Sequence, residues 1–259
     1  MKKFLAVLLS LMMVLSFTAC SGSGNANETW QDELGNKGTL RVGMAADYPP
    51  YESYDASGKV VGFDADMAQA IADELGVQCE IIQMDFDTII TAVAAGTVDL
   101  GISCFSYNEE RAKSVLFTDT YMTSSQACFA SSQYGVKTME DLKDGVVGAG
   151  NGTTGMDVAE ELKEQYGYTT QAGEIAVMTE ALKAGTMKGI ITEQCVANAY
   201  INANPDDYVM IENALTIEEI QAVTNLENDK LQAAVNDALK KIMGDEKAYN
   251  DMILKWFDN

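Results

Sequence analysis

Short apolar runs alternate with amphipathic helical segments along most of this chain, and that alternation limits the folds open to it. The segment 64–75 is typical of the helices, because Met67, Ile71 and Leu75 fall on one face and Gly76 stands where a helix-ending glycine belongs. Strands separated by helices of this length form right-handed βαβ units with parallel strands. The first units are predicted as strands at 40–44, 79–83 and 99–102 and helices at 64–75 and 88–95, the second helix capped by Asp87.

The same pattern repeats further along the chain, so we expect two α/β lobes. The chain is expected to cross between them near Ser125 and to return near Glu219, with the last two helices packed on the first lobe. This places lobe 1 at 36–124 and 219–259, and lobe 2 at 125–218. The further elements are predicted as strands at 127–130, 145–149, 189–192 and 220–223, a helix that opens within 150–155 and runs to about residue 166, and helices at 179–184, 198–202, 229–243 and 246–257.

The first twenty residues have the layout of an export signal. Lys2 and Lys3 precede an apolar run at 4–17, a pattern typical of a signal peptide rather than of a membrane-spanning helix. Cys20 follows Ala19 directly, as the acylated cysteine does in a bacterial lipobox. We expect residues 1–20 to be a signal peptide with a lipobox and residues 21–35 to be a flexible tether. The mature protein would then be extracytoplasmic and lipid-anchored to the outer face of the cell membrane.

The composition excludes several classes of function. The 259 residues carry a net charge of −22, which disfavours nucleic acid and anionic membrane surfaces as partners. There is no histidine, which removes histidine-dependent triads and most zinc sites, and we expect no metal and no cofactor. The cysteines beyond Cys20 could pair in an exported protein. Each lies in an apolar or strand-like stretch, however, and we expect four free thiols, at Cys79, Cys104, Cys128 and Cys195.

The stretch 99–113 has the features of a ligand site. A buried strand runs into a loop with hydroxyls at Ser103 and Ser106, and Asn108 is placed to cap a short helix that carries Arg111. Ligands bind at the carboxyl ends of strands in open α/β sheets, and a guanidinium there can hold a carboxylate by two charge-assisted bonds. The alternative is a surface arginine that pairs with a neighbouring glutamate, and this stretch alone does not decide between them.

A glycine pattern, Gly150-x-Gly152-x-x-Gly155, follows a predicted strand and opens a helix at Thr153 and Thr154. It matches the dinucleotide fingerprint, which is weak evidence when it stands alone. A smaller anion held at the helix N-terminus is favoured over a nucleotide. A plain turn between strand and helix is the remaining alternative.

Three further residues stand at ends of predicted strands or in the loops that follow them. Tyr48 and Phe86 occupy equivalent loops, which suggests two walls of a ligand slot, although a loop aromatic is often only a core residue. Glu193 closes a strand and opens a helix, where an acid also interacts favourably with the helix dipole.

Five segments closely resemble the extracytoplasmic solute-binding proteins of polar amino-acid ABC importers: LRVGMAADYPPYE, GFDADMAQAIADELG, MDFDTIITAVAAGTVDLGIS, EERAKSVLFTDTYM and VVGAGNGTTG. The resemblance covers 38–257 and implies the type II two-lobe periplasmic-binding-protein fold. Each lobe would be a mainly parallel sheet with flanking helices, and two crossing strands would form the hinge. It also implies a monomeric, non-enzymatic protein that captures an amino acid by hinge closure and delivers it to a membrane permease.

The resemblance also implies roles for individual residues. Arg111 matches the arginine that binds the α-carboxylate of the ligand, and Thr154 matches the residue of lobe 2 that assists it. Two serines match residues that contact the backbone groups of the ligand, and the two loop aromatics match residues around its side chain. The predicted ligand-binding residues are therefore Arg111, Ser103, Ser106, Cys104, Tyr48, Phe86, Thr154, Glu193 and Thr153.

Three positions depart from the pattern of that family. Glu193 stands where an aspartate takes the α-ammonium, and Cys104 replaces a serine or glycine beside the ligand. Ala45 stands where many members have an acid for a cationic side chain, so we expect a neutral polar or cystine-like ligand. Asp47, Asp85 or Asp87 could substitute for that acid. An exported enzyme on the same fold, similar to cyclohexadienyl dehydratase, and a ligand sensor are the alternative functions.

Overall fold

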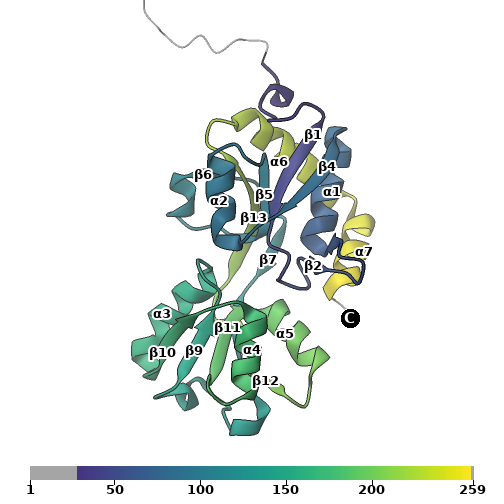
Figure 1. Ribbon diagram of the computed structural model, residues 1–259. Helices are drawn as coiled ribbons and strands as arrows, with labels where there is room; N and C mark the ends of the chain where they lie inside the picture. Colours follow the sequence, from purple (N-terminus) through teal and green to yellow (C-terminus); the bar gives the residue numbers. More distant parts are fainter. Residues whose placement is uncertain (1–27, 258–259) are drawn as a thin grey trace, which may run out of the picture.

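The computed structural model describes residues 28–257, which form two α/β lobes joined by two segments of chain (Figure 1). The predicted signal peptide, the acylation of Cys20 and the beginning of the tether lie outside the described residues and stay predictions. Within the described part, no helix combines the length and the apolar character needed to span a membrane.

The first sheet combines strands from both ends of the chain. Its order is β4-β1-β5-β13-β6, and β7 also pairs with β13. β1 is parallel to β4 and β5, whereas β13 is antiparallel to β5, β6 and β7. The strands are β1 (Thr39–Met44), β4 (Gln78–Gln83), β5 (Leu100–Ser106), β6 (Val115–Phe117), β7 (Met122–Ser124) and β13 (Glu218–Asn225).

Helices flank this sheet on both sides (Figure 1). On one side α1 (Phe63–Leu75) contacts α6 (Asp229–Gly244) and α7 (Glu246–Phe257), and on the other α2 (Phe86–Ala94) packs against β1, β5 and β13. The two terminal helices therefore pack on the first lobe, as the sequence predicts. A short hairpin arm is also present, because β2 (Ser53–Tyr54) pairs with β3 (Val60–Val61) around the turn at 55–58.

The second sheet has the order β10-β9-β11-β8-β12. β9 is parallel to β10 and β11, and β8 is antiparallel to β11 and β12. Three helices connect and cover these strands: α3 (Thr154–Tyr166), α4 (Ile175–Lys183) and α5 (Gln194–Ala203). The strands are β8 (Gln126–Ser131), β9 (Val146–Ala149), β10 (Thr169–Ala172), β11 (Gly189–Glu193) and β12 (Tyr208–Glu212).

Both sheets are mixed rather than mainly parallel, and the crossings between the lobes explain why. The chain changes sheet between β7 and β8 and again between β12 and β13. A strand that arrives from the other lobe enters its new sheet from the opposite end, so β8 and β13 pair antiparallel with their neighbours. The two-lobe fold class is confirmed, whereas the predicted lobe boundaries stay a prediction.

Some elements differ from those that the sequence predicts. α2 begins at Phe86 with Asp85 as its N-cap rather than Asp87, and α4 begins at Ile175, earlier than the predicted start at residue 179. α5 also begins before the predicted segment. β10 and β12 were not predicted at all, because they are edge strands with several exposed positions and show no continuous apolar run.

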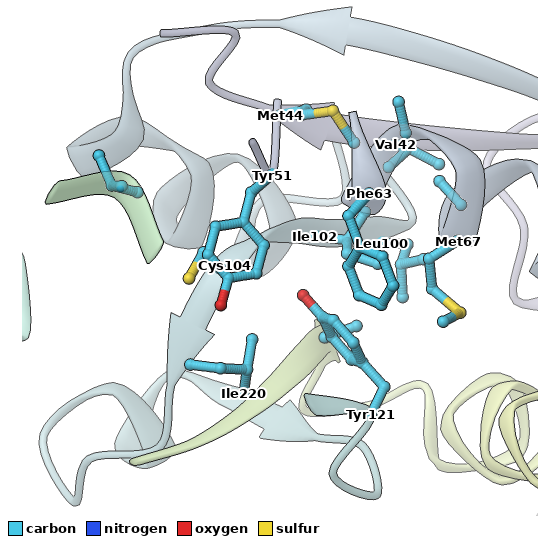
Figure 2. Packing of buried hydrophobic residues seen from close by; sticks show 14 of the residues in the cluster. Val42, Met44, Tyr51, Phe63, Met67, Leu100, Ile102, Cys104, Tyr121 and Ile220 are labelled. Carbon is cyan, nitrogen blue, oxygen red and sulfur yellow. The ribbon is translucent and has the colours of Figure 1, made fainter. Parts of the chain in front are cut away.

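Three aromatic rings form the centre of the first lobe (Figure 2). Tyr51, Phe63 and Tyr121 are all buried, with ring centroids 6.3 Å apart for Tyr51 and Phe63 and 6.2 Å apart for Phe63 and Tyr121. Burial of a side chain of the size of phenylalanine stabilises a fold by about 1.5–3 kcal/mol. The cluster lies directly beside Cys104 of β5 and so supports the end of the strand that carries the predicted ligand loop.

Candidate functional site

A cavity of ≈ 590 Å³ is lined by residues of both lobes. Its walls come from the loops after β1 and β4, from β5, and from the first turns of α3, α4 and α5. The carboxyl ends of parallel strands from both sheets therefore converge on one space, as expected for ligand sites in α/β sheets. All predicted ligand-binding residues line this cavity except Ser106, which is buried next to it.

Arg111 presents its guanidinium to this cavity. Its Nη1 donates to the carbonyl of Ser106 at 2.7 Å and its Nη2 donates to the carbonyl of Gly152, in the other lobe, at 2.9 Å. The guanidinium carbon lies 5.5 Å from the ring centroids of Phe86 and Phe105, within reach of a cation–π interaction.

The surroundings of Arg111 argue against a mere surface arginine. The side chain of Asn108 accepts the backbone N–H of Arg111 at 2.8 Å. The prediction that Asn108 caps the helix is wrong, however, because the helix is a single 3-10 turn, Arg111–Lys113, with Glu110 as its N-cap. Glu110 pairs with Lys113 instead. Burial lowers the pKa of Arg111, and among the described residues no ion pair neutralises it. This cation can accept a carboxylate from outside.

The loop at the end of β5 is held by two buried acids that the sequence did not single out. Ser103 donates to Glu52 at 2.6 Å and accepts the N–H of Ala45 at 3.1 Å. Cys104, at a φ of 49°, donates its N–H to Asp64 at 2.6 Å, so a direct bond stabilises this left-handed backbone. The hydroxyl of Ser103 is already engaged and acts mainly to position the loop.

Glu52 and Asp64 are buried within reach of each other's charge. Burial, followed by the charge of Asp64, raises the pKa of Glu52 well above its ordinary value. Burial also raises the pKa of Asp64 to about 6, although the N–H of Cys104 and the hydroxyl of Tyr121 act in the opposite direction. Burial therefore opposes ionisation of both carboxyl groups, and the charge of Asp64 adds to this effect at Glu52. No local sequence pattern distinguishes either acid from a surface residue.

Glu193, on the opposite lobe, is almost entirely buried, with 2% of its surface exposed. Its Oε1 accepts from Gln126 at 2.7 Å and its Oε2 accepts from the hydroxyl of Ser124. Burial, and next the charge of Glu218, raises the pKa of Glu193 to about 8. An ammonium group placed against this carboxyl would lower that pKa again, because an opposite charge favours the ionised form.

Tyr48 bridges the two lobes through its hydroxyl. The oxygen lies 2.6 Å from the hydroxyl of Thr192 and accepts the backbone N–H of Glu193 at 3.1 Å. A second bridge lies nearby, where Asn151 donates to Asp87 at 2.7 Å. Asp87 thus contacts the facing lobe instead of capping α2.

The two predicted aromatic residues differ in their contacts. Phe86 stacks on Phe105 with ring centroids 4.8 Å apart, and both rings lie near the guanidinium of Arg111. Tyr48 instead stacks at 6.4 Å on Tyr51 of the core. The structure places both on the wall of one cavity.

The glycine pattern before α3 is explained by the backbone. Gly152 has a φ of +68°, and a Cβ on Gly155 would approach the side chain of Gln126 and the carbonyl of Ile191 to within 2.8 and 3.0 Å. Thr153 caps α3 by accepting the N–H of Met156 at 3.2 Å. The turn therefore accounts for the glycines, while Thr154 faces the cavity.

Acidic residues from both lobes form an acidic wall of the cavity, and three of them are the aspartates that the sequence left as substitutes. Burial raises the pKa of Asp47, and the charges of Glu174 and Asp85 act in the same direction. These like charges repel one another in the ligand-free protein. The acids on the wall, beyond Glu52 and Glu193, are Asp47, Asp85, Asp87 and Glu174.

Comparison with known proteins gives a consistent result. The family model for bacterial extracellular solute-binding proteins, family 3, matches residues 40–259. The arginine-binding extracellular protein ArtP of Bacillus subtilis is 31% identical over 99% of this chain and 98% of its own length. The L-cystine-binding protein TcyJ of Escherichia coli is 26% identical over 96% of this chain and 94% of its own length. The crystal structure of the P235GK mutant of ArgBP from T. maritima has a TM-score of 0.81 and 32% identity, and the match covers 89% of this chain and 100% of that one.

Proposed function

The chain belongs to the bacterial extracellular solute-binding proteins of family 3, and we propose that it captures an amino acid between its lobes for an ABC importer. Arg111 of lobe 1 would bind the α-carboxylate, and Glu193 of lobe 2 would bind the α-ammonium. The observation that carries this proposal is the placement of a half-buried cation and a buried acid on facing walls of one cavity. A zwitterion complements both charges at once.

Closure of the lobes would follow from the contacts that the ligand makes with lobe 2. A ligand held by Arg111 and Phe86 gains the bonds to Thr154 and Glu193 only when the lobes meet, so its binding favours the closed form. Charge-assisted bonds contribute roughly 1.5–3 kcal/mol each. Three or four of them suffice for a micromolar dissociation constant, which needs about 8 kcal/mol.

The charge of the ligand side chain is a finer question. Ala45 offers no partner to a cation, and this favours the neutral polar or cystine-like ligand that the sequence predicts. Asp47, Asp85 and Glu174 favour a cation instead, since a positive group would relieve their mutual repulsion. We extend the proposal to a cationic side chain, as in arginine, because several acids on the same wall outweigh the missing one at Ala45.

Isothermal titration of the purified protein with arginine, lysine, glutamine and cystine tests this proposal. Arginine or lysine should bind most tightly, and Asp47→Asn should weaken them at least tenfold while it leaves glutamine unchanged. Asp237→Asn, an exposed acid on α6, is the matched control. If glutamine or cystine binds best, the argument from the acidic wall is wrong and the prediction from Ala45 stands.

The lipid anchor and the handover to a permease are part of the same proposal. Cys20→Ala should move the protein from the membrane fraction to the soluble fraction, because the acylated side chain is lost. Delivery can be measured as ligand-dependent ATP hydrolysis by the partner importer in vesicles. An unchanged membrane fraction would exclude Cys20 as the anchor.

The alternative function, an exported enzyme on the same fold, requires an acid or base of its own. Glu193 and Glu52 line the cavity and both have a raised pKa, but the proposed ammonium contact employs Glu193 and the hydroxyl of Ser103 binds Glu52. Recovery of the bound molecule from the purified protein distinguishes the two functions. An amino acid recovered unchanged supports the receptor, and a converted product supports the enzyme.

A further inference from the structure

Glu218 holds a position that neither the sequence patterns nor the proposed ligand contacts explain. It is the first residue of β13, where the chain returns to lobe 1. Its Oε1 accepts from the hydroxyl of Thr216 at 2.9 Å. Its Oε2 accepts from Thr154 of lobe 2 at 2.8 Å and from Ser106 of lobe 1. A single carboxylate thus joins both lobes and the returning segment of chain.

The same two hydroxyls lie beside Arg111. The guanidinium donates to the carbonyl of Ser106 and to that of Gly152, which stands two residues before Thr154. The charge of Glu218 also acts on Arg111 without an ion pair between them. The carboxylate of Glu218 therefore lies next to the place where Arg111 would hold the carboxylate of a ligand.

The hydrogen-bond capacity of these hydroxyls makes the two carboxylates competitors. A hydroxyl has one proton to donate, and an ionised carboxylate can only accept. Ser106 and Thr154 each donate to Glu218, and Thr154 in addition accepts from Gln126 at 3.2 Å. Neither hydroxyl has a proton left for a second carboxylate.

We propose that Glu218 is an internal competitor of the ligand: its carboxylate occupies the hydroxyls of Ser106 and Thr154 and must release them when the ligand's carboxylate binds. This inference rests on the proposed function, because the ligand is taken to carry a carboxylate. Glu218 sets the affinity of the site, since each binding event exchanges its bonds for those of the ligand. Glu193, on which the charge of Glu218 acts, would meet the α-ammonium group next to that carboxylate.

The experiment compares Glu218→Ala with Glu219→Ala, which removes the same charge from the neighbouring, exposed position of β13. Titration calorimetry with arginine and glutamine gives the dissociation constants. Glu218→Ala should bind its ligand about tenfold more tightly than the wild type, equivalent to about 1.4 kcal/mol. Glu219→Ala should match the wild type. An unchanged or weaker affinity of Glu218→Ala overturns the proposal.

Sodium formate provides a second readout that does not depend on amino-acid binding. In Glu218→Ala, formate can fill the space of the lost carboxylate, so it should raise the melting temperature and compete with the amino acid. It should do neither in the wild type or in Glu219→Ala, with sodium chloride at equal ionic strength as the reference. An equal response of the three proteins overturns the proposal.

Glu218→Gln keeps the size of the side chain and one acceptor oxygen but removes the charge, so it replaces Glu218→Ala if the alanine variant does not fold, and a smaller gain in affinity over the wild type is expected. If no protein binds any amino acid, the proposed function fails, and the formate response alone still decides whether Glu218 occupies a carboxylate site.

Discussion

Glu193 should make closure of the empty protein depend on pH. In the structure it is buried between Ser124 and Gln126, within the field of Glu218, and its pKa is raised from 4.5 to about 8. When the lobes separate, the carboxyl group is hydrated and its pKa returns toward the ordinary value. Closure of the empty protein therefore takes up a proton between pH 4.5 and about 8.

The size of the effect follows from this shift. One pKa unit corresponds to about 1.4 kcal/mol, so the shift of Glu193 amounts to about 5 kcal/mol. Below pH 4.5 the carboxyl group of Glu193 is neutral in both forms and does not affect the free energy of closure. Above pH 4.5 the free energy of closure becomes less favourable by about 1.4 kcal/mol per pH unit up to pH 8, and it is constant above that. A ligand ammonium removes this unfavourable contribution by supplying the opposite charge.

Small-angle scattering of the ligand-free protein at pH 5 and pH 8.5 measures how far the lobes separate as the pH rises. The wild type should expand as the pH rises, whereas Glu193→Gln, which stays neutral, should keep its compact dimensions. Glu161→Gln, an exposed acid on α3, is the control and should behave as the wild type. If Glu193→Gln expands as much as the wild type over this range, the reasoning is refuted.

Three further outcomes are expected. Arg111→Met should weaken amino-acid binding at least a hundredfold in calorimetry with little change of the unfolding midpoint, because it removes the cation that receives the carboxylate; retained affinity would contradict the site. Tyr48→Phe should weaken binding about tenfold, since the closed form loses the bonds to Thr192 and to the backbone of Glu193, and scattering should show a more open empty protein. Thiol reagents should react slowly with the native protein and should modify four thiols per mature protein only after unfolding. The reason is that burial raises the pKa of these thiols, which are Cys79, Cys104, Cys128 and Cys195.

Local patterns were sufficient to predict most of the elements. The apolar face of 64–75 and its closing Gly76, which adopts a φ of +70°, predicted α1 almost to its ends. The polar edge strand β10 escaped prediction because the hydrophobic period that marks a strand is absent where both faces are exposed. The start of α4 was missed because its first four residues, 175–178, are a continuous apolar run in which no helical period is visible.

The two-lobe architecture could be predicted from sequence alone, and so could the residues with distinctive local settings, such as Arg111 after a buried strand and Thr154 at a helix start. Only the tertiary structure showed the partners of these residues, because Glu52, Asp64, Gln126 and Glu218 come from distant elements and have ordinary neighbours in the chain. Hydrogen bonds and burial depend on which residues folding brings together. They decide the pKa of a carboxyl group and whether a hydroxyl still has a proton to donate to a ligand. The acidic wall arises in the same way, since its members become one feature only when the two lobes face each other.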